Sequence, residues 1–329
     1  MKRILVTGAG GHLGSNLVRE LLAQGHAVTA MVRREKPALA GVDVPRAFGD
    51  VMEADSLPAL FEGHEVVMHL AGRISIVGDP NGAVRAVNVQ GTDNVARACL
   101  RSGARMVHCS SIHAFDLWAH GPDSMDETGP RVPAESTTHT AYDLSKADGE
   151  RVVRALLPEG LDAVIAHPTG VLGPHDYDPS RMGQVFLDLY RGSLPSLVQG
   201  GFDFVDIRDV VLGLAACVER GATGQSYLMS GRYVTIPELG QMAQAVTGRR
   251  PPWFTSPMWL ARMAAPLFQG WAQMRGSEPL YTGESLSTLR RRCTVDSSKA
   301  RRELGFVSRD LQDSVRDLYA WFDARGVLR

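Results

Sequence analysis

The start of the chain combines a short apolar strand, a turn rich in glycine and a helical pattern, and this combination restricts the fold more than any other feature. Residues 4–6 predict a buried strand, and leucines at helical spacing predict a helix over 13–24. Between them lies Thr7-Gly8-Ala9-Gly10-Gly11-His12-Leu13-Gly14, with the spacing Gly-x-x-Gly-x-x-Gly. Such a turn exposes free backbone N–H groups at the helix N-terminus, which bind phosphate. The sequence therefore predicts a nucleotide-binding unit.

Strands and helices continue to alternate through the first half of the chain. Strands are predicted over 27–32, 65–70, 105–109 and 163–167, and helices over 88–102 and 141–157. Short apolar strands that alternate with helices are typical of a parallel sheet covered on both faces. We therefore expect an α/β fold, with a doubly wound parallel Rossmann sheet over 1–175 and a smaller C-terminal substrate domain over 176–329. A strand near 225–229 is expected to rejoin the sheet.

The second half of the chain is less regular. Helices are predicted over 205–220 and 236–246. The segment 253–274 is rich in Trp, Met, Phe and Leu, but Pro257, Arg262 and Pro266 interrupt it and argue against a membrane span. An amphipathic helix over a core or a pocket is the favoured interpretation, and a lid or a helix lying on a membrane surface stays open. Arg290-Arg291-Arg292 is interpreted as a solvated turn or a phosphate-facing patch.

Composition limits the classes of partner. The 329 residues carry a formal net charge of −1, which excludes attraction of the whole protein to nucleic acid or anionic lipid, though not a local patch. The four cysteines form no Cys-x-x-Cys pair and no metal-ligand spacing, so we expect free thiols, no metal and a cytoplasmic location. No stretch approaches the ~20 apolar residues of a membrane span. A small-molecule substrate is the expected partner.

The residues after the second strand indicate which nucleotide binds. An NAD site usually has an Asp or Glu there, about 20 residues past the glycine turn, to hold the ribose 2′-hydroxyl. This chain has Arg33 and Arg34 instead. A guanidinium binds a 2′-phosphate bidentately, whereas a carboxylate would repel it. The prediction is NADP(H) in preference to NAD(H), with Arg33 as the first choice of contact and NAD(H) kept as the alternative.

A hydroxyl, a phenol and an ammonium group follow in an order that indicates proton transfer. Tyr142 and Lys146 are four residues apart on a predicted helix and therefore share one face. A phenol has a pKa near 10, and a nearby ammonium group lowers it. Ser110-Ser111 directly follows the strand 105–109, at the sheet edge where doubly wound folds bind ligands. A serine there can hydrogen-bond a substrate oxygen beside the phenol.

With these motifs in place, the chain resembles the extended short-chain dehydrogenase/reductase family over most of its length, in its dihydroflavonol reductase-like and hydroxysteroid dehydrogenase-like branch. By this resemblance the catalytic residues are Ser111, Tyr142 and Lys146, and Ser111 contacts the substrate. His113 flanks the expected pocket and is either a second acid, a substrate contact or a polar part of the pocket wall. The cofactor-binding positions implied are Thr7, Gly8, Gly11, His12, Leu13, Gly14, Arg33, Arg34, Asp50, Val51, Leu70, Ala71, Gly72, Asn88, Tyr142, Lys146, Pro168, Thr169, Gly170 and Val171.

The resemblance also implies a mechanism. Hydride passes between the cofactor and a carbonyl carbon, Tyr142 gives or takes the proton on the oxygen, and Ser111 orients that oxygen. Lys146 lowers the Tyr142 pKa and holds the nicotinamide ribose. Asn88 is either part of a proton relay or a helix cap. The expected reaction is NADPH-dependent reduction of an aldehyde or ketone, with an apolar substrate, and the family implies a homodimer formed through the helices 88–102 and 141–157.

Two other functions stay open, a nucleotide-sugar epimerase and a non-catalytic NADP-sensing regulator, whereas the residues argue against a nucleotide-sugar dehydratase. A nucleotide-sugar epimerase would keep NAD bound, but Arg33 replaces the usual acid. A nucleotide-sugar dehydratase would carry Asp and Glu directly after the active hydroxyl residue, where this chain has Ile112 and His113. A non-catalytic NADP-sensing regulator needs no Ser111, Tyr142 or Lys146, so their presence argues against it.

Overall fold

The predicted strands form one parallel sheet in the computed structural model, which describes residues 1–119, 124–274, 281–291 and 293–328. The strand order is β10-β6-β5-β4-β1-β2-β3, and the chain winds outward from β1 in one direction and from β4 in the other. The strands are β1 (Arg3–Thr7), β2 (Ala27–Val32), β3 (Arg46–Phe48), β4 (Val66–His69), β5 (Arg105–Cys109), β6 (Ala163–Pro168) and β10 (Ser226–Met229). This is the predicted doubly wound Rossmann sheet.

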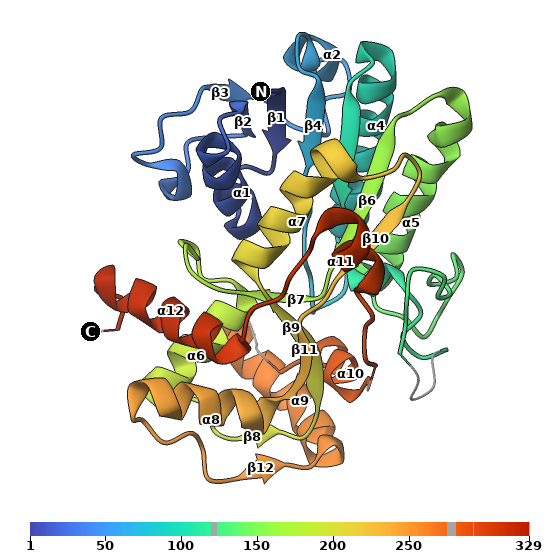
Figure 1. The fold of residues 1–329 in the computed structure, drawn as a ribbon. Coiled ribbons are helices and arrows are strands. Elements are labelled where there is room, and N and C mark those ends of the chain that lie inside the picture. Colours follow the sequence, from blue (N-terminus) through green and yellow to red (C-terminus); the bar gives the residue numbers. More distant parts are fainter. Residues whose placement is uncertain (120–123, 275–280, 292, 329) are drawn as a thin grey trace.

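Helices cover both faces of the sheet because its strands are apolar on both sides (Figure 1). Ile4 and Val6 belong to the core under α1 and α7, whereas Leu5 belongs to the core under α4 and α5. The helices of this part are α1 (His12–Ala23), α2 (Leu57–Phe61), α3 (Ala83–Arg85), α4 (Gly91–Ser102), α5 (Ala141–Leu156), α7 (Ile207–Arg220) and α11 (Ser298–Leu304). Short 3₁₀ turns span Pro37–Leu39, Ile112–Ala114 and Leu157–Glu159.

The helix predicted over 88–102 begins earlier in the structure, because the backbone is helical without a break from Ala83 of α3 to Ser102 of α4. A π-helical turn occupies Ala86–Gln90, and α4 starts at Gly91. The neighbouring helix α5 crosses at this turn, where a Cβ on Gly149 would lie 2.6 Å from the Asn88 carbonyl oxygen. The turn therefore coincides with a close approach of two backbones.

A smaller lobe contains two short sheets, β11-β9-β7 and β12-β8, and the helices packed around them. Its strands are β7 (Gly170–Leu172), β8 (Leu197–Val198), β9 (Gly201–Asp206), β11 (Arg232–Thr235) and β12 (Thr255–Ser256). Its helices are α6 (Arg181–Arg191), α8 (Ile236–Thr247), α9 (Met258–Met274), α10 (Gly283–Arg290) and α12 (Leu311–Ala324). Phe186, Phe204, Leu239 and Phe322 are among the side chains of its core.

Two predicted helices of the second half start too early. The helix predicted over 205–220 begins only at Ile207, because Val205 and Asp206 end β9, which pairs with β7 and β11. Asp206 then caps α7 by accepting a hydrogen bond from the Arg208 backbone N–H. Within 253–274, residues 255–256 pair with β8, and α9 starts after Pro257. In the described part of the chain, no helix is long and apolar enough to cross a membrane.

Two buried histidines lie under α5 on neighbouring strands. His69 of β4 is paired in register with His108 of β5, and their rings stack with centroids 5.4 Å apart. The His69 ring nitrogens are hydrogen-bonded to Thr7 and Thr92, whereas neither ring nitrogen of His108 has a partner among the described residues. Burial lowers the pKa of His69 to about 3 and that of His108 well below its ordinary value. Both rings are therefore neutral in the folded protein.

These histidines predict loss of stability in weak acid. Below pH 6.5 the unfolded chain binds protons that the folded chain does not, so the free energy of unfolding should fall by about 2 kcal/mol per buried histidine between pH 7 and pH 5. His108→Phe keeps a ring and should lose about 2 kcal/mol less than the wild type over this range. Urea unfolding at the two pH values measures both proteins. Equal losses in the two proteins would contradict the assignment.

Candidate functional site

A cleft of about 830 Å³ opens at the carboxyl ends of β1 and β4, where the direction of strand winding reverses. Ligands of doubly wound sheets bind at this point. Many of the cofactor positions predicted from the sequence lie on its wall. They are Thr7, Gly8, Gly11, His12, Arg33, Arg34, Asp50, Val51, Leu70, Ala71 and Gly72.

The glycine turn brings two backbones together at the floor of the cleft. Gly8 has a φ of +67°, and a Cβ there would lie 2.7 Å from the Ala71 backbone nitrogen. A Cβ on Gly14 would lie 2.2 Å from the Gly8 carbonyl oxygen, so α1 can approach β1 only with glycine at this position. The Thr7 hydroxyl accepts hydrogen bonds of 3.2 Å from the backbone N–H groups of Leu70 and Ala71. The close packing leaves the N-terminus of α1 beside an open cradle.

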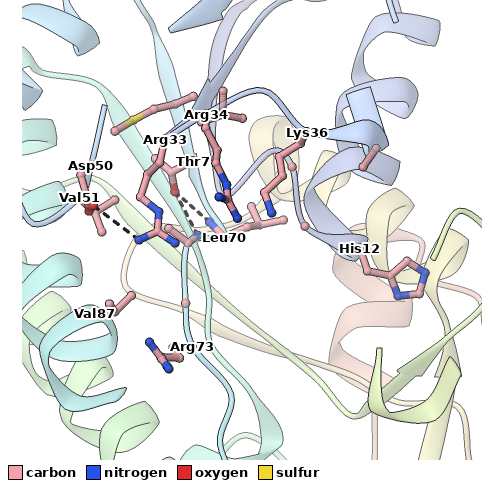
Figure 2. A pocket seen from close by; sticks show the side chains of 18 of the residues that line it. Thr7, His12, Arg33, Arg34, Lys36, Asp50, Val51, Leu70, Arg73 and Val87 are labelled. Carbon is pink, nitrogen blue, oxygen red and sulfur yellow. Dashed lines mark hydrogen bonds and ion pairs between the residues drawn. The ribbon is translucent and has the colours of Figure 1, made fainter. Parts of the chain in front are cut away.

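Cationic side chains gather at one end of this cleft. Figure 2 shows Arg33, Arg34 and Lys36 side by side after β2, with Arg73 on the opposite wall. Arg33 has a side chain 76% exposed, and its Nη1 lies 3.7 Å from Asp50 Oδ2. Lys36 and Arg73 were not predicted from the sequence, although Lys36 follows Arg34 closely in the same loop. This end of the cleft is suited to a phosphate group.

Tyr142 and Ser111 meet at the start of α5. Thr140 begins this helix with a capping box. The Thr140 hydroxyl accepts a hydrogen bond from the Asp143 backbone N–H, and the Asp143 carboxylate accepts one from the Thr140 backbone N–H. Burial raises the pKa of Tyr142, and a hydrogen bond with Ser111 acts in the opposite direction. The phenol is therefore protonated at neutral pH in this state, with the Ser111 hydroxyl as its direct partner.

The Lys146 ammonium lies one helical turn further along α5, near the wall of the cleft. Its Nζ donates to the Cys109 carbonyl over 3.3 Å, and burial lowers its pKa. A Cβ on Gly72 would lie 3.6 Å from this Nζ and 3.3 Å from Asn88 Oδ1. Asn88 itself accepts from the Arg73 N–H and donates to the Arg73 carbonyl and to Ser145 Oγ. Asn88 thus fastens the loop after β4 to α5.

The remaining predicted cofactor residues are not on the wall of the cleft. Leu13 and Gly14 lie within the first turn of α1, and 168–171 spans the end of β6 and the start of β7. There Thr169 donates to Asp203 Oδ1 over 2.7 Å, and Gly170 packs against the Phe204 ring. The structure therefore places 168–171 at the junction between the main sheet and the smaller lobe.

A buried ion pair supports the ring of His113 beside Tyr142. Asp143 is fully buried, and its carboxylate accepts from His113 Nδ1 over 2.6 Å and from Arg291 Nη2 over 2.8 Å. The His113 ring meets the Tyr142 ring edge-on at 5.1 Å and stacks on Phe202 at 5.6 Å. Burial alone would raise the pKa of Asp143, but the hydrogen bond from His113 and the charge of Arg291 hold it below its ordinary value.

The prediction that 290–292 form a solvated turn or a phosphate-facing patch is wrong for Arg291, which is buried. Its guanidinium is buried against the Trp118 ring, 4.9 Å away, and pairs with Asp143. Residue 292 lies outside the described residues. No local signal distinguishes Arg291 from Arg290, because its partner is 148 residues away in the sequence. The structure thus adds Arg291 and Asp143 to the surroundings of the predicted catalytic residues.

Comparison with known proteins agrees with this geometry. A model of the NAD dependent epimerase/dehydratase family matches residues 4–230. A protein named sterol demethylase protein B of Methylococcus capsulatus is 36% identical over 98% of this chain and 99% of its own length. A putative dihydroflavonol 4-reductase of Synechocystis is 29% identical over 98% of this chain and 95% of its own. The crystal structure of gox2253 superposes with a TM-score of 0.86 at 31% identity, over all of both chains.

The family match covers the glycine turn, the cleft, Ser111, Tyr142 and Lys146, and the relatives extend over the smaller lobe as well. The motifs had indicated the same family from the sequence alone. The chain belongs to the NAD dependent epimerase/dehydratase family, that is, to the extended short-chain dehydrogenases/reductases, whose members are NAD(P)-dependent oxidoreductases.

Proposed function

We propose that this protein is an NADPH-dependent reductase that converts an apolar aldehyde or ketone to an alcohol. The observation that carries the proposal is the hydrogen-bonded Ser111–Tyr142 pair, with Lys146 one turn away, beside a cleft that has cations at its far end. A proton donor is needed where a carbonyl oxygen becomes a hydroxyl, and Tyr142 is protonated at neutral pH. Among the alternatives, a sensor of NADP would need the cleft but not this pair.

The residues of the cleft fit a dinucleotide. A Cβ on Gly8 or Gly14 would collide with neighbouring backbone, so these glycines allow the close packing that leaves Gly10, Gly11 and the N-terminus of α1 on the wall of the cleft. Arg33 and Arg34 would hold the 2′-phosphate of NADPH, with Lys36 as an additional cation, and Lys146 would hold the nicotinamide ribose near Gly72. When bound, the nicotinamide supplies the hydride.

Side chains of α5 and of the turn that follows β5 would transfer the proton. Ser111 Oγ hydrogen-bonds the substrate oxygen and sets its direction relative to the Tyr142 phenol. Tyr142 then donates its proton as negative charge develops on that oxygen. A phenolate left in a largely buried site is unfavourable, and the Lys146 ammonium nearby stabilises it.

His113 would complete the substrate wall. Its Nδ1 is engaged by Asp143, which leaves Nε2 without a hydrogen bond to any described residue. The ring lies between Tyr142 and Phe202, and in this proposal Nε2 contacts the substrate near the reacting oxygen. Phe202, which stacks on His113 and packs against the buried Phe204, makes the surroundings of His113 apolar, which supports an apolar substrate. The names of two relatives, a sterol demethylase protein and a putative dihydroflavonol reductase, also indicate apolar substrates. A homodimer formed through α4 and α5 is also part of the proposal.

Replacement of Tyr142 by Phe tests the proton transfer. Tyr142→Phe should lower kcat by about 10²–10⁴-fold and leave NADPH binding intact, because only the donated proton is lost. Turnover is measured as NADPH oxidation with a panel of apolar aldehydes and ketones. Tyr190→Phe, in α6, is the matched control and should behave as the wild type. Unchanged turnover in Tyr142→Phe would refute the mechanism.

Replacement of Arg33 tests the choice of coenzyme. Arg33→Ala should weaken NADPH binding by roughly tenfold and leave NADH binding unchanged, since an exposed guanidinium contributes only moderately. Fluorescence titration of the apoprotein measures both affinities, with Arg101→Ala as a control at a distant exposed arginine. If the purified protein releases stoichiometric NAD on denaturation and shows no preference for NADPH, a nucleotide-sugar epimerase becomes the better assignment.

Replacement of Asp143 tests the support beneath His113. Asp143→Asn leaves the buried Arg291 charge without its partner and should lower the free energy of unfolding by about 3–5 kcal/mol at pH 7. The exposed pair of Asp93 and Arg97 is the control, and Asp93→Asn should cost less than about 0.5 kcal/mol. The double variant Asp143→Asn/Arg291→Met removes both charges and should recover part of the loss in urea unfolding. A small loss in the single variant would contradict the pairing.

A further inference from the structure

Large apolar side chains are exposed on the outer face of α9 and on the segment before it. Trp253 is 96% exposed, Trp259 64% and Met263 70%, and the Phe254 ring lies tilted beside the Trp253 ring with centroids 5.8 Å apart. These four residues, together with Arg250 and Arg262, are called the α9 patch below. Soluble surfaces seldom gather tryptophan in this way without a partner.

The two faces of α9 show that the exposure is not a packing defect. The inner face carries Ala261 and Ala265, which pack with Val198 of β8 and Leu286 of α10 in a small core. The outer face carries Trp259, Arg262, Met263 and Pro266, all exposed. A surface helix ordinarily turns polar residues outward. Here the inner face is already packed, and the apolar outer face is left uncovered by the described residues.

All charged side chains in and around α9, from residue 239 to residue 274, are positive. From residue 239 to residue 274 the sequence has no aspartate or glutamate, although the chain has 36 acidic residues, and it has three arginines, 249, 250 and 262. Arg250 and Arg262 are exposed, and neither is paired with a carboxylate in the described part of the chain. The acid on the neighbouring helix, Glu284 of α10, has a buried carboxylate oxygen and so faces inward. The α9 patch is therefore basic as well as aromatic.

We propose that the α9 patch docks this protein on the surface of an anionic lipid bilayer. Tryptophan and apolar side chains partition into the boundary between headgroups and acyl chains, and arginines bind lipid phosphates. Trp253, Trp259 and Met263 insert at this boundary, and Arg250 and Arg262 select anionic lipid. The protein lies on the bilayer and does not cross it by these elements. A net charge of −1 for the whole chain does not prevent a local basic patch from binding anionic lipid.

The position of α9 relates the proposed docking to the candidate catalytic site. α9 packs on α10, and α10 ends at Arg290, next to the Arg291 that holds Asp143 beside Tyr142. Docking through the outer face of α9 would hold the lobe that borders the catalytic pair at the bilayer surface, where an apolar substrate is dissolved. That link rests on the proposed function, whereas the docking itself does not.

Vesicle flotation tests the docking with the full-length protein. Wild type should float with vesicles of phosphatidylcholine and phosphatidylglycerol, float less with phosphatidylcholine alone, and dissociate as salt rises. The variant Trp253→Ser/Trp259→Ser/Met263→Ser should lose about tenfold or more in binding to either vesicle. Arg250→Gln/Arg262→Gln should lose roughly fivefold per arginine on phosphatidylglycerol vesicles only. Val307→Ser, at a residue 73% exposed after α11, should bind as the wild type.

NADPH titration and thermal unfolding establish that each variant is folded, so loss of flotation reports the surface alone. Wild type that floats with neither vesicle, or a triple Ser variant that floats as well as wild type, would overturn the proposal. So would a dimer in sedimentation velocity that the Ser variant abolishes, because the patch would then be a contact between two copies. Carbonyl turnover is measured in solution, and its absence would refute the proposed reaction without bearing on flotation.

Discussion

The fully buried carboxylate of Asp143 is the interaction on which the rest of the site depends. It caps α5, the helix that carries Tyr142 and Lys146, and it also binds His113 after β5 and Arg291 after α10. Removing two charges from water is costly, and the cost is offset only when the hydrogen bonds to both are well formed. The position of the phenol is therefore coupled to the correct placement of a segment from the other end of the chain. A loosely docked smaller lobe would disturb the start of α5.

Charge is distributed unevenly around the sheet. Under α5 the rings of His69 and His108 are held neutral by burial, whereas the cationic side chains of Arg33, Arg34 and Lys36 line the cleft. Cations along the cleft attract a phosphorylated ligand over distance, whereas neutral groups below the catalytic helix spare Lys146 from strong repulsion. The same chain thus keeps positive potential where a dinucleotide would enter and limits it where a proton would be transferred.

Much of the main sheet was predictable, because buried parallel strands are continuous apolar runs with clear boundaries. The strands predicted over 27–32 and 105–109 have those bounds in the structure, and the others of the first half agree to about one residue. The glycine turn and the pair Tyr142–Lys146 are local motifs and were equally visible. The strands of the smaller lobe are short, and Val205 was assigned to a helix because its pairing with β7 and β11 is nonlocal. Arg291 could not be recognised, since its neighbours in sequence are also arginines and only tertiary structure selects one of them.

The route of the chain between its two parts has a further consequence. After β6 the chain leaves the main sheet for β7, returns through α7 and β10, leaves again at β11, and returns once more as α11 before it ends in α12. No single cut separates a complete dinucleotide fold from a complete smaller lobe. Evolution therefore cannot exchange the substrate lobe as one contiguous cassette, and new specificity has to arise by substitution and loop insertion within an interleaved chain.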